Sequence, residues 1–532
     1  MIEKATLRLT PEEAADNDII LKSATRQLGL DAGKINDWKV TRRSIDARKR
    51  DVAVNLIVEM AYGEDTSVVR HEVVEFKPLE AGAPTVVIAG AGPAGLFAAL
   101  RILEGGMRPV ILERGKDVDS RRLDIAMLNR NGIVDADSNY CFGEGGAGTF
   151  SDGKLYTRSK KRGDNETVMN LLVQFGAKEE ILTDSHPHIG SDRLPHIIKA
   201  IREKIIECGG EVRFGSKVEK LLLEEIKESD SGRKLRAKGV ELASGERIYG
   251  EVILATGHSA RDTLRNLHAQ GVKMEAKGFA MGVRLEHPSA MIDRIQYHSK
   301  EGRGPYLPAA EYNFVTQVAG RGVYSFCMCP GGVVVPAVAA PGESVVNGMS
   351  ASARSGPFSN SGMVVEIHPE DFPEYASEGV FSLMRLQEDT ERRFYAAAGK
   401  TLRSPAQRMY DFVNGRMSGS LPKTSYAPGL IPARVDELLP PFVASRLKEG
   451  FREFGRKSKG FLTNEAVVIG LESRTSSPVR LPRNRDTLEH EEIAGLYPAG
   501  EGAGYAGGII SAAVDGRRCA DSVIKERKKK RK

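Results

Sequence analysis

Residues 86–113 read VVIAGAGPAGLFAALRILEGGMRPVILE, and this stretch decides the fold. An apolar strand, a glycine turn, a helix and a second strand follow one another, which is the context that gives the pattern G-x-G-x-x-G its meaning. Gly90 permits the tight turn, Gly92 leaves space for a pyrophosphate, and Gly95 lets the helix pack closely on the sheet. The helix N-terminus favours an anion. The stretch therefore predicts a Rossmann-like site for an adenine dinucleotide.

Four more residues of this unit belong to the predicted cofactor site. Pro93 and Ala94 begin the helix, Glu113 ends the second strand, and Arg114 follows it. Glu113 lies where an acid accepts hydrogen bonds from the ribose of adenosine. A membrane span is the alternative, because residues 85–100 carry no charge. The three glycines and the proline fit a turn better, so we expect no transmembrane segment.

Composition sets further bounds. A chain of 532 residues is long enough for two or three domains. Its five cysteines are scattered and odd in number, which argues against a disulfide framework. Its ten histidines show no metal-binding spacing, so we expect no metal site. The start, MIEKATLRLTPEE, lacks the basic and apolar segments of a secretory signal. We therefore expect a cytoplasmic protein.

The net charge of +6 comes from one end of the chain. Residues 525–532, KERKKKRK, hold seven basic residues and one acidic residue, so the rest of the chain is formally neutral. We expect this basic tail to be solvated and disordered. Contact between the tail and a nucleic acid, a membrane or an acidic partner is the less favoured alternative, because so short a segment gives only salt-sensitive attraction.

The pattern along the chain predicts an α/β protein of three domains. Residues 1–80 have the order βαββ, half of a ferredoxin-like unit, and form a small N-terminal domain. Residues 81–270 and 481–524 form a Rossmann-like domain of three layers, ββα, which binds the cofactor. Residues 271–480 mix strands, helices and proline breaks, and form an inserted α+β cap domain over the cofactor.

Basic side chains crowd the hairpin of the N-terminal domain. Arg42, Arg43 and the turn at 48–50 carry most of them. Charges commonly protect an exposed strand edge, which is the main interpretation. A docking surface for a partner or for the rest of the protein is the alternative.

Two downstream segments favour FAD over NAD. EVILATG (251–257) resembles the turn of two-dinucleotide-fold flavoproteins, in which Ala255, Thr256 and Gly257 pass close to the cofactor. GLYPAGEGAGYAGGIISAAVDG (495–516) resembles the C-terminal flavin motif of the same superfamily. That motif usually has Gly-Asp at the end of its strand, whereas this chain has Gly500-Glu501.

A third segment, CFGEGGAGTFSDGKL (141–155), is similar to glycine-rich loops that lie along the flavin in such enzymes. A helix that begins near Gly508 could stabilise the negative charge that develops on the flavin pyrimidine during reduction. From these segments and one neighbouring strand we predict the remaining cofactor residues: Gly145, Gly146, Val218, Ala255, Thr256, Gly257, Gly500, Glu501, Gly507, Gly508 and Ile509.

Longer segments resemble a narrower family. ESRTSSPVRLPRN (472–484), followed by the flavin motif, is similar to a poorly characterised family of FAD-dependent dehydrogenases. Further matches are GSDRLPHIIKAIR (190–202), KGFAMGVRLEHP (277–288), FCMCPGG (326–332) and VVNGMSASAR (345–354). The resemblance covers essentially the whole chain and implies non-covalent FAD and a small N-terminal α/β domain. The sequence indicates no separate NAD(P)-binding domain, so any NAD(P)H reductant would dock transiently.

One of the matching segments supplies the first catalytic candidates. Arg474 could orient an anionic substrate or the flavin pyrimidine, because a guanidinium offers a planar fork of donors. Ser476 and Ser477 would add hydroxyl donors. A structural ion pair with Glu472 or Asp486 is the alternative for the arginine.

Three other side chains each allow two interpretations. His258 directly follows the Thr256-Gly257 turn and could act as an acid or base near the cofactor, although a hydrogen bond within the turn is more common. Cys327 and Cys329 would share one face of a strand. A redox pair is the less favoured interpretation, because a C-x-C disulfide is strained.

Together these features predict an FAD-dependent oxidoreductase that passes a hydride or electrons between FAD and a small organic substrate. An electron-transfer protein could be a second partner. One alternative is a flavin-dependent monooxygenase that uses NAD(P)H and oxygen. The other is a non-catalytic FAD-binding module that binds partners through its N-terminal domain and basic tail.

Overall fold

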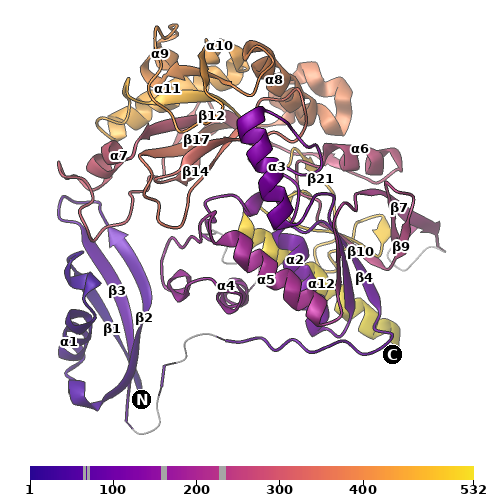
Figure 1. The fold of residues 1–532 in the computed structure, drawn as a ribbon, viewed down its shortest axis with the longest axis horizontal. Helices are drawn as coiled ribbons and strands as arrows, with labels where there is room; N and C mark the ends of the chain where they lie inside the picture. Colours follow the sequence, from indigo (N-terminus) through magenta and orange to yellow (C-terminus); the bar gives the residue numbers. More distant parts are fainter. Residues whose placement is uncertain (64–66, 69–71, 157–163, 227–234, 532) are drawn as a thin grey trace.

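The computed structural model of the protein describes residues 1–63, 67–68, 72–156, 164–226 and 235–531. Figure 1 shows a small N-terminal sheet at one side, a central domain built on a parallel sheet, and a cap domain above the central one. The two ends of the chain lie far apart, and an extended segment runs along the base of the central domain to join the N-terminal sheet to it.

The dinucleotide unit forms where the sequence predicts it. β4 (Thr85–Ala89) leads into α2 (Pro93–Glu104), which returns the chain to β5 (Arg108–Leu112). β6 (Glu211–Arg213), β10 (Glu251–Leu254) and β23 (Leu496–Pro498) complete a parallel sheet with the order β23-β10-β4-β5-β6. The strand before the C-terminal flavin motif therefore lies beside β10, and β10 lies beside the first strand of the unit.

This sheet is covered on both faces, which is why its strands are apolar throughout. Val86 and Ile88 face a core with α2, α5 (Leu194–Glu207) and α12 (Ile509–Arg531). Val87 and Ala89 face a second sheet, because side chains alternate along a strand. The second sheet consists of β7 (Val218–Glu225), β8 (Leu235–Leu242), β9 (Arg247–Tyr249) and β22 (Ile493–Ala494). The predicted α/β class with ββα layers is confirmed.

The cap domain is built on a seven-stranded sheet with the order β13-β14-β17-β12-β20-β18-β19. Its strands are β12 (Phe279–Pro288), β13 (Val315–Val318), β14 (Arg321–Cys329), β17 (Phe358–Ile367), β18 (Ser404–Arg408), β19 (Leu430–Pro432) and β20 (Val467–Glu472). Phenylalanines from α8 (Ser382–Ala397) and α11 (Pro441–Lys457) pack against this sheet. β11 (Glu275–Ala276) pairs with β21 (Val479–Arg480), so the two ends of the cap meet.

The N-terminal domain docks on the rest of the protein through an edge strand. β1 (Ile2–Leu9), α1 (Asn17–Leu28), β2 (Ile35–Asp46) and β3 (Ala53–Tyr62) form a sheet with the order β1-β3-β2. At the free edge of β2, the Arg43 amide donates to the Thr183 carbonyl and the Arg43 carbonyl accepts from the Ser185 amide, each at 2.9 Å. The hairpin thus docks on the protein body, which was the alternative interpretation of this basic segment.

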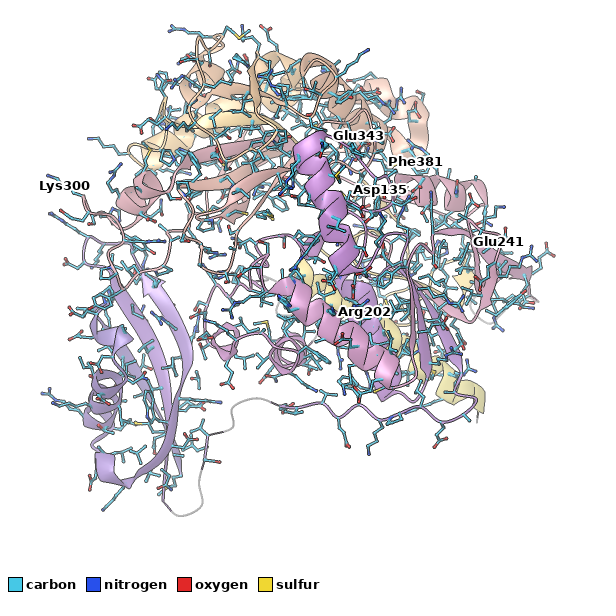
Figure 2. All side chains as sticks on the ribbon, viewed as in Figure 1. Asp135, Arg202, Glu241, Lys300, Glu343 and Phe381 are labelled. Carbon is cyan, nitrogen blue, oxygen red and sulfur yellow. The ribbon has the colours of Figure 1, made fainter. Side chains whose placement is uncertain are left out.

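The tip of the same hairpin reaches the cap. Ile45, Ala47 and Val52 pack on the cap core, and the Ala47 carbonyl lies 3.0 Å from Nε2 of His298. Figure 2 places the neighbouring Lys300 at this end of the cap, above the N-terminal sheet.

The basic tail is helical, and our expectation of disorder was wrong for its described part. α12 runs from Ile509 to Arg531. Lysine and arginine are good helix formers, and positive charge is favourable at a helix C-terminus. Arg527 also pairs with Glu251 at 3.0 Å. Lys532 lies outside the described residues. None of the described helices combines the length and apolar character needed to cross a bilayer.

Candidate functional site

The first glycine loop is packed tightly on one side and open on the other. Gly90 has φ +107°, and a Cβ there would lie 2.4 Å from the Ala255 carbonyl oxygen; a Cβ at Gly95 would lie 1.9 Å from the Gly90 carbonyl oxygen. At Gly92, the nearest described atom is Cα of Gly146 at 3.9 Å. The fold itself therefore requires glycine at 90 and 95, whereas Gly92 borders free space.

A second glycine loop lies over the first. The Gly145 amide donates to the Ala91 carbonyl at 2.8 Å, and both Gly145 and Gly146 have positive φ. Fully buried Arg121, which the sequence did not point to, anchors this loop. Its guanidinium donates to the carbonyls of Asn139 (2.8 Å), Tyr140 (3.1 Å) and Glu144 (2.8 Å).

The loops line one cavity of about 320 Å³ between the central domain and the cap. The predicted cofactor residues that line it are Gly90, Gly92, Pro93, Ala94, Glu113, Arg114, Gly146, Val218, Ala255, Thr256, Gly257, Glu501, Gly507, Gly508 and Ile509. Gly95, Gly145 and Gly500 do not line it. They lie behind the loops, where they allow close packing: a Cβ at Gly500 would lie 2.8 Å from Cβ of Ala94.

Glu113 ties the loops together. Its carboxylate accepts from the amides of Ala91, Gly115 and Gly143, each at 2.9 Å. A carboxylate has about four acceptor positions, so one remains for a ribose hydroxyl. Its neighbour Arg114 pairs with Asp137 and Asp262 and lies over the ring of Phe142, where it shapes the cavity wall.

The C-terminal motif forms the opposite wall. The Gly500 amide donates to Asp515 at 2.8 Å, and Arg483 holds Asp515 in turn. Glu501 faces the cavity, with its carboxyl oxygen 3.9 Å from Nε2 of His258. α12 begins at Ile509, so the free amides of its first turn lie at the cavity.

Arg474 lines the cavity, but acids hold most of its guanidinium. Nη2 donates to Glu343 at 2.5 Å and to Glu391 at 3.2 Å, and Nε lies 3.4 Å from Glu391. The structural ion pair that we kept as an alternative is therefore present, with different acids: Glu472 pairs with Arg284 at 3.1 Å. Nη1 makes only long contacts at the wall, 3.5 Å to Sγ of Cys141 and 3.4 Å to Oγ of Ser259.

The two predicted serine donors do not face the cavity, and we correct their role. Ser477 is fully buried, and its hydroxyl donates to the Val479 carbonyl at 2.6 Å. Ser476 also lies off the cavity wall. The Ser477 hydroxyl also lies 3.2 Å from the Gly502 carbonyl, inside the protein. Thr475 lines the cavity instead.

The two cysteines of FCMCPGG both line the cavity, on a distorted strand. β14 has a bulge between Phe326 and Cys329, and Cys327 has φ +42°, so the thiol of Cys327 is exposed to the cavity while Cys329 is buried. Arg284 donates to the Cys327 carbonyl at 2.7 Å and fixes this geometry. Both thiols are free, and burial raises the pKa of Cys329. The thiolate needed for redox chemistry is therefore disfavoured.

Several other residues line the cavity without a role predicted from the sequence. These are Asp152, Lys154, Tyr156, Phe326, Asn347 and Gly348. All of them lie in or directly beside segments quoted above, 141–155, 326–332 and 345–354, so the segments signalled their importance. The sequence did not show which side chains of these segments face the cavity, because that depends on how each segment is aligned with its neighbours in the fold.

Parts of the chain match known protein families, and the whole chain matches a known protein. A family model described as "FAD-dependent protein, C-terminal domain-like" matches residues 278–475, and a "Domain of unknown function (DUF8436)" matches residues 1–61. An uncharacterized protein of Clostridium beijerinckii is 39% identical over 530 residues, which cover 96% of each chain. The chain belongs to this family of FAD-dependent flavoproteins.

The solved structures that resemble this chain have lower sequence identity to it than the Clostridium protein has. A geranylgeranyl bacteriochlorophyll reductase-like protein of Thermoplasma acidophilum gives a TM-score of 0.34 at 13% identity, over 84% of this chain and 80% of that one. A 3-ketosteroid-delta4-(5alpha)-dehydrogenase of Rhodococcus jostii RHA1 gives 0.33 at 13% identity, over 84% and 99%.

The cavity of this flavoprotein fits FAD. Open space at Gly92 and the N-terminus of α2 suit the pyrophosphate, and Glu113 retains an acceptor for the ribose. The N-terminus of α12 suits the pyrimidine of the flavin, which becomes negative on reduction. Glu501, whose side chain is 27% exposed, lines the same cavity.

Two titratable groups beside the flavin site have pKa values far from their usual range. Burial raises the pKa of Glu501 to about 7, against the lowering effect of Lys277. Burial, with the charges of Arg474 and Arg261, lowers the pKa of His258 to about 3. A histidine with so low a pKa is neutral at pH 7 and is a weak base, so the acid–base role considered for His258 is not supported.

We expect the visible spectrum of the flavin-loaded protein to titrate with an apparent pKa near 7. Glu501 is neutral below this pH and becomes a carboxylate above it, and a new negative charge at the flavin shifts its absorption. Glu501→Gln should abolish the titration, whereas Glu491→Gln at the surface should keep it. An unchanged pKa in Glu501→Gln would show that another group is responsible.

Proposed function

We propose that the protein is an FAD-dependent oxidoreductase that passes a hydride or an electron pair between non-covalent FAD and a small organic substrate. The observation that supports this proposal is that the central domain and the cap line the same cavity. Its central-domain walls carry the dinucleotide loop, the turn after β10 and the start of α12, while cap residues such as Phe326 and Gly348 line the same space. A protein that only bound FAD would not need a cap domain that lines a space next to the flavin.

The residues of this chain position the reaction rather than perform it. FAD supplies a two-electron centre when it is bound. The amides at the start of α12 favour negative charge at the pyrimidine, and the cap keeps bulk water away from the reacting face. NAD(P)H would serve as a transient reductant, and an electron-transfer protein could be the acceptor.

The function is tested with the purified protein. It should be yellow and release FAD when denatured. Anaerobic mixing with NADH, NADPH and a panel of organic donors should bleach the flavin with at least one of them, and oxygen or a quinone should restore the colour. A colourless protein that takes up only NAD would overturn the proposal. Rapid oxygen consumption without substrate turnover would instead indicate a monooxygenase.

A further inference from the structure

One half of the cavity faces the cap, and we call it the substrate half. Tyr156, Phe326, Cys327, Asn347 and Gly348 mark this substrate half. Among the described residues, the titratable acids and cations that line it are Asp152, Lys154, His258, Arg474 and Glu501. These are the side chains that could pair with a charged substrate in this half of the cavity.

Arg474 belongs to a neutral buried cluster. Arg261 donates to both oxygens of Glu391 at 2.9 Å and to Glu343 at 3.2 Å, and Arg474 contacts the same two acids. Ser473 donates to Glu391 at 2.7 Å. The two arginines and the two glutamates therefore cancel. Figure 2 shows Glu343 above the end of α3 (Val118–Asn131), where the cap meets the central domain.

Lys154 belongs to a second neutral cluster. Its ammonium donates to Asp152 at 3.0 Å and to the Met328 carbonyl. Arg354 pairs with Asp152 and, at 2.6 Å, with Glu311. One lysine and one arginine thus face two acids. Exposed His186 contacts Glu311 from outside the cavity wall.

The remaining groups add no uncompensated cation. His258 is neutral, and Lys277 lies outside the lining, where its ammonium donates to the carbonyls of Gly278 and Ser477. An anionic substrate would have to displace one of the carboxylates or enter without a partner, and burying an unpaired charge is costly. The aromatic and sulfur-bearing side chains of the wall offer contact with an apolar body instead.

We infer that the substrate of this site is an uncharged molecule with an apolar ring or chain, because the two cations of the substrate half, Lys154 and Arg474, already pair with carboxylates of the protein. The inference rests on the proposed function, and of the two roles considered for Arg474 it leaves the flavin pyrimidine rather than an anionic substrate. It also makes Glu343 a specificity-determining residue. Glu343 does not line the cavity, yet it supplies one of the charges that would otherwise leave Arg474 open to an anion.

The test compares two ring compounds that differ in charge. Flavin-loaded protein is titrated with benzamide and with benzoate at pH 8, and binding is followed by the shift in flavin absorbance. The wild type should favour benzamide at least 10-fold. In Glu343→Gln, Arg474 gains an uncompensated charge, so the affinity for benzoate relative to benzamide should rise at least 10-fold. The glutamine keeps an acceptor for the amides of Ala339 and Ala340, which Glu343 binds at 3.2 Å.

Glu343→Asp is the matched control, because it retains the negative charge and should keep the wild-type preference. A gain of benzoate binding cannot result from misfolding. A wild type that binds benzoate at least as tightly as benzamide, or a Glu343→Gln protein without the gain, would overturn the inference. Flavin content is measured first: a protein without flavin contradicts the proposed function, whereas a yellow protein that prefers benzoate contradicts only the uncharged substrate.

Discussion

Gly92→Val should give a folded but colourless protein. Gly92 precedes the first residue of α2 with φ −75° and ψ −177°, a conformation open to any residue, and a Cβ there would touch only Cα of Gly146 among the described atoms, at 3.9 Å. The valine methyl groups would instead fill the space for the pyrophosphate. We expect a loss of FAD affinity of at least ~100-fold, which is about 2.7 kcal/mol. The measurement is flavin absorbance per protein after gel filtration.

Two glycine variants separate this effect from damage to the fold. Gly92→Ala adds one methyl group and should weaken FAD binding less than valine does. Gly95→Ala places its Cβ 1.9 Å from the Gly90 carbonyl oxygen and should lower the yield of folded protein itself. A Gly92→Val protein that is yellow with wild-type affinity would contradict the placement of the pyrophosphate. Loss of cooperative thermal unfolding in Gly92→Val would contradict the claim that only the ligand requires glycine there.

The cofactor half of the site was accessible from sequence because its constraints are local. A tight turn, a helix start and a close backbone approach each demand glycine within a few residues, as at Gly90 and Gly95. The order of strand, turn, helix and strand then identified these glycines as part of a dinucleotide-binding unit. The same reasoning linked the turn at Gly257 to the loop at Gly90, because β10 and β4 are adjacent.

The substrate half was less accessible because its contacts are distant in sequence. Acids near Arg474 in the chain were the expected partners, but Glu343 and Glu391 come from segments 131 and 83 residues away. The bulge in β14 separates Cys327 from Cys329, which a regular strand would have kept on one face. Composition alone could not show that the basic tail extends α12, where Arg527 reaches Glu251.

The buried cluster around Arg474 predicts the largest loss of stability. Glu391 is fully buried and accepts from Arg261, Arg474 and Ser473. Glu391→Gln would leave two buried arginines with one carboxylate, and breaking a buried ion pair from one side costs about 3–5 kcal/mol of unfolding free energy. Denaturant unfolding at pH 7 measures this loss. Asp389→Asn, on the same helix but in exposed pairs with Arg385 and Arg392, should cost less than about 1 kcal/mol.

The pH dependence of stability gives an independent check on the same carboxylate. Burial alone would raise the pKa of Glu391, but Arg261 and Arg474 outweigh it and lower the pKa from 4.5 to about 2. A depressed pKa stabilises the folded state above pH 4.5, and this contribution disappears as the pH falls from 4.5 towards 2. The wild type should therefore lose unfolding free energy over this range, and Glu391→Gln should lose less. An equally steep acid limb in both proteins would mean that other carboxylates control acid unfolding.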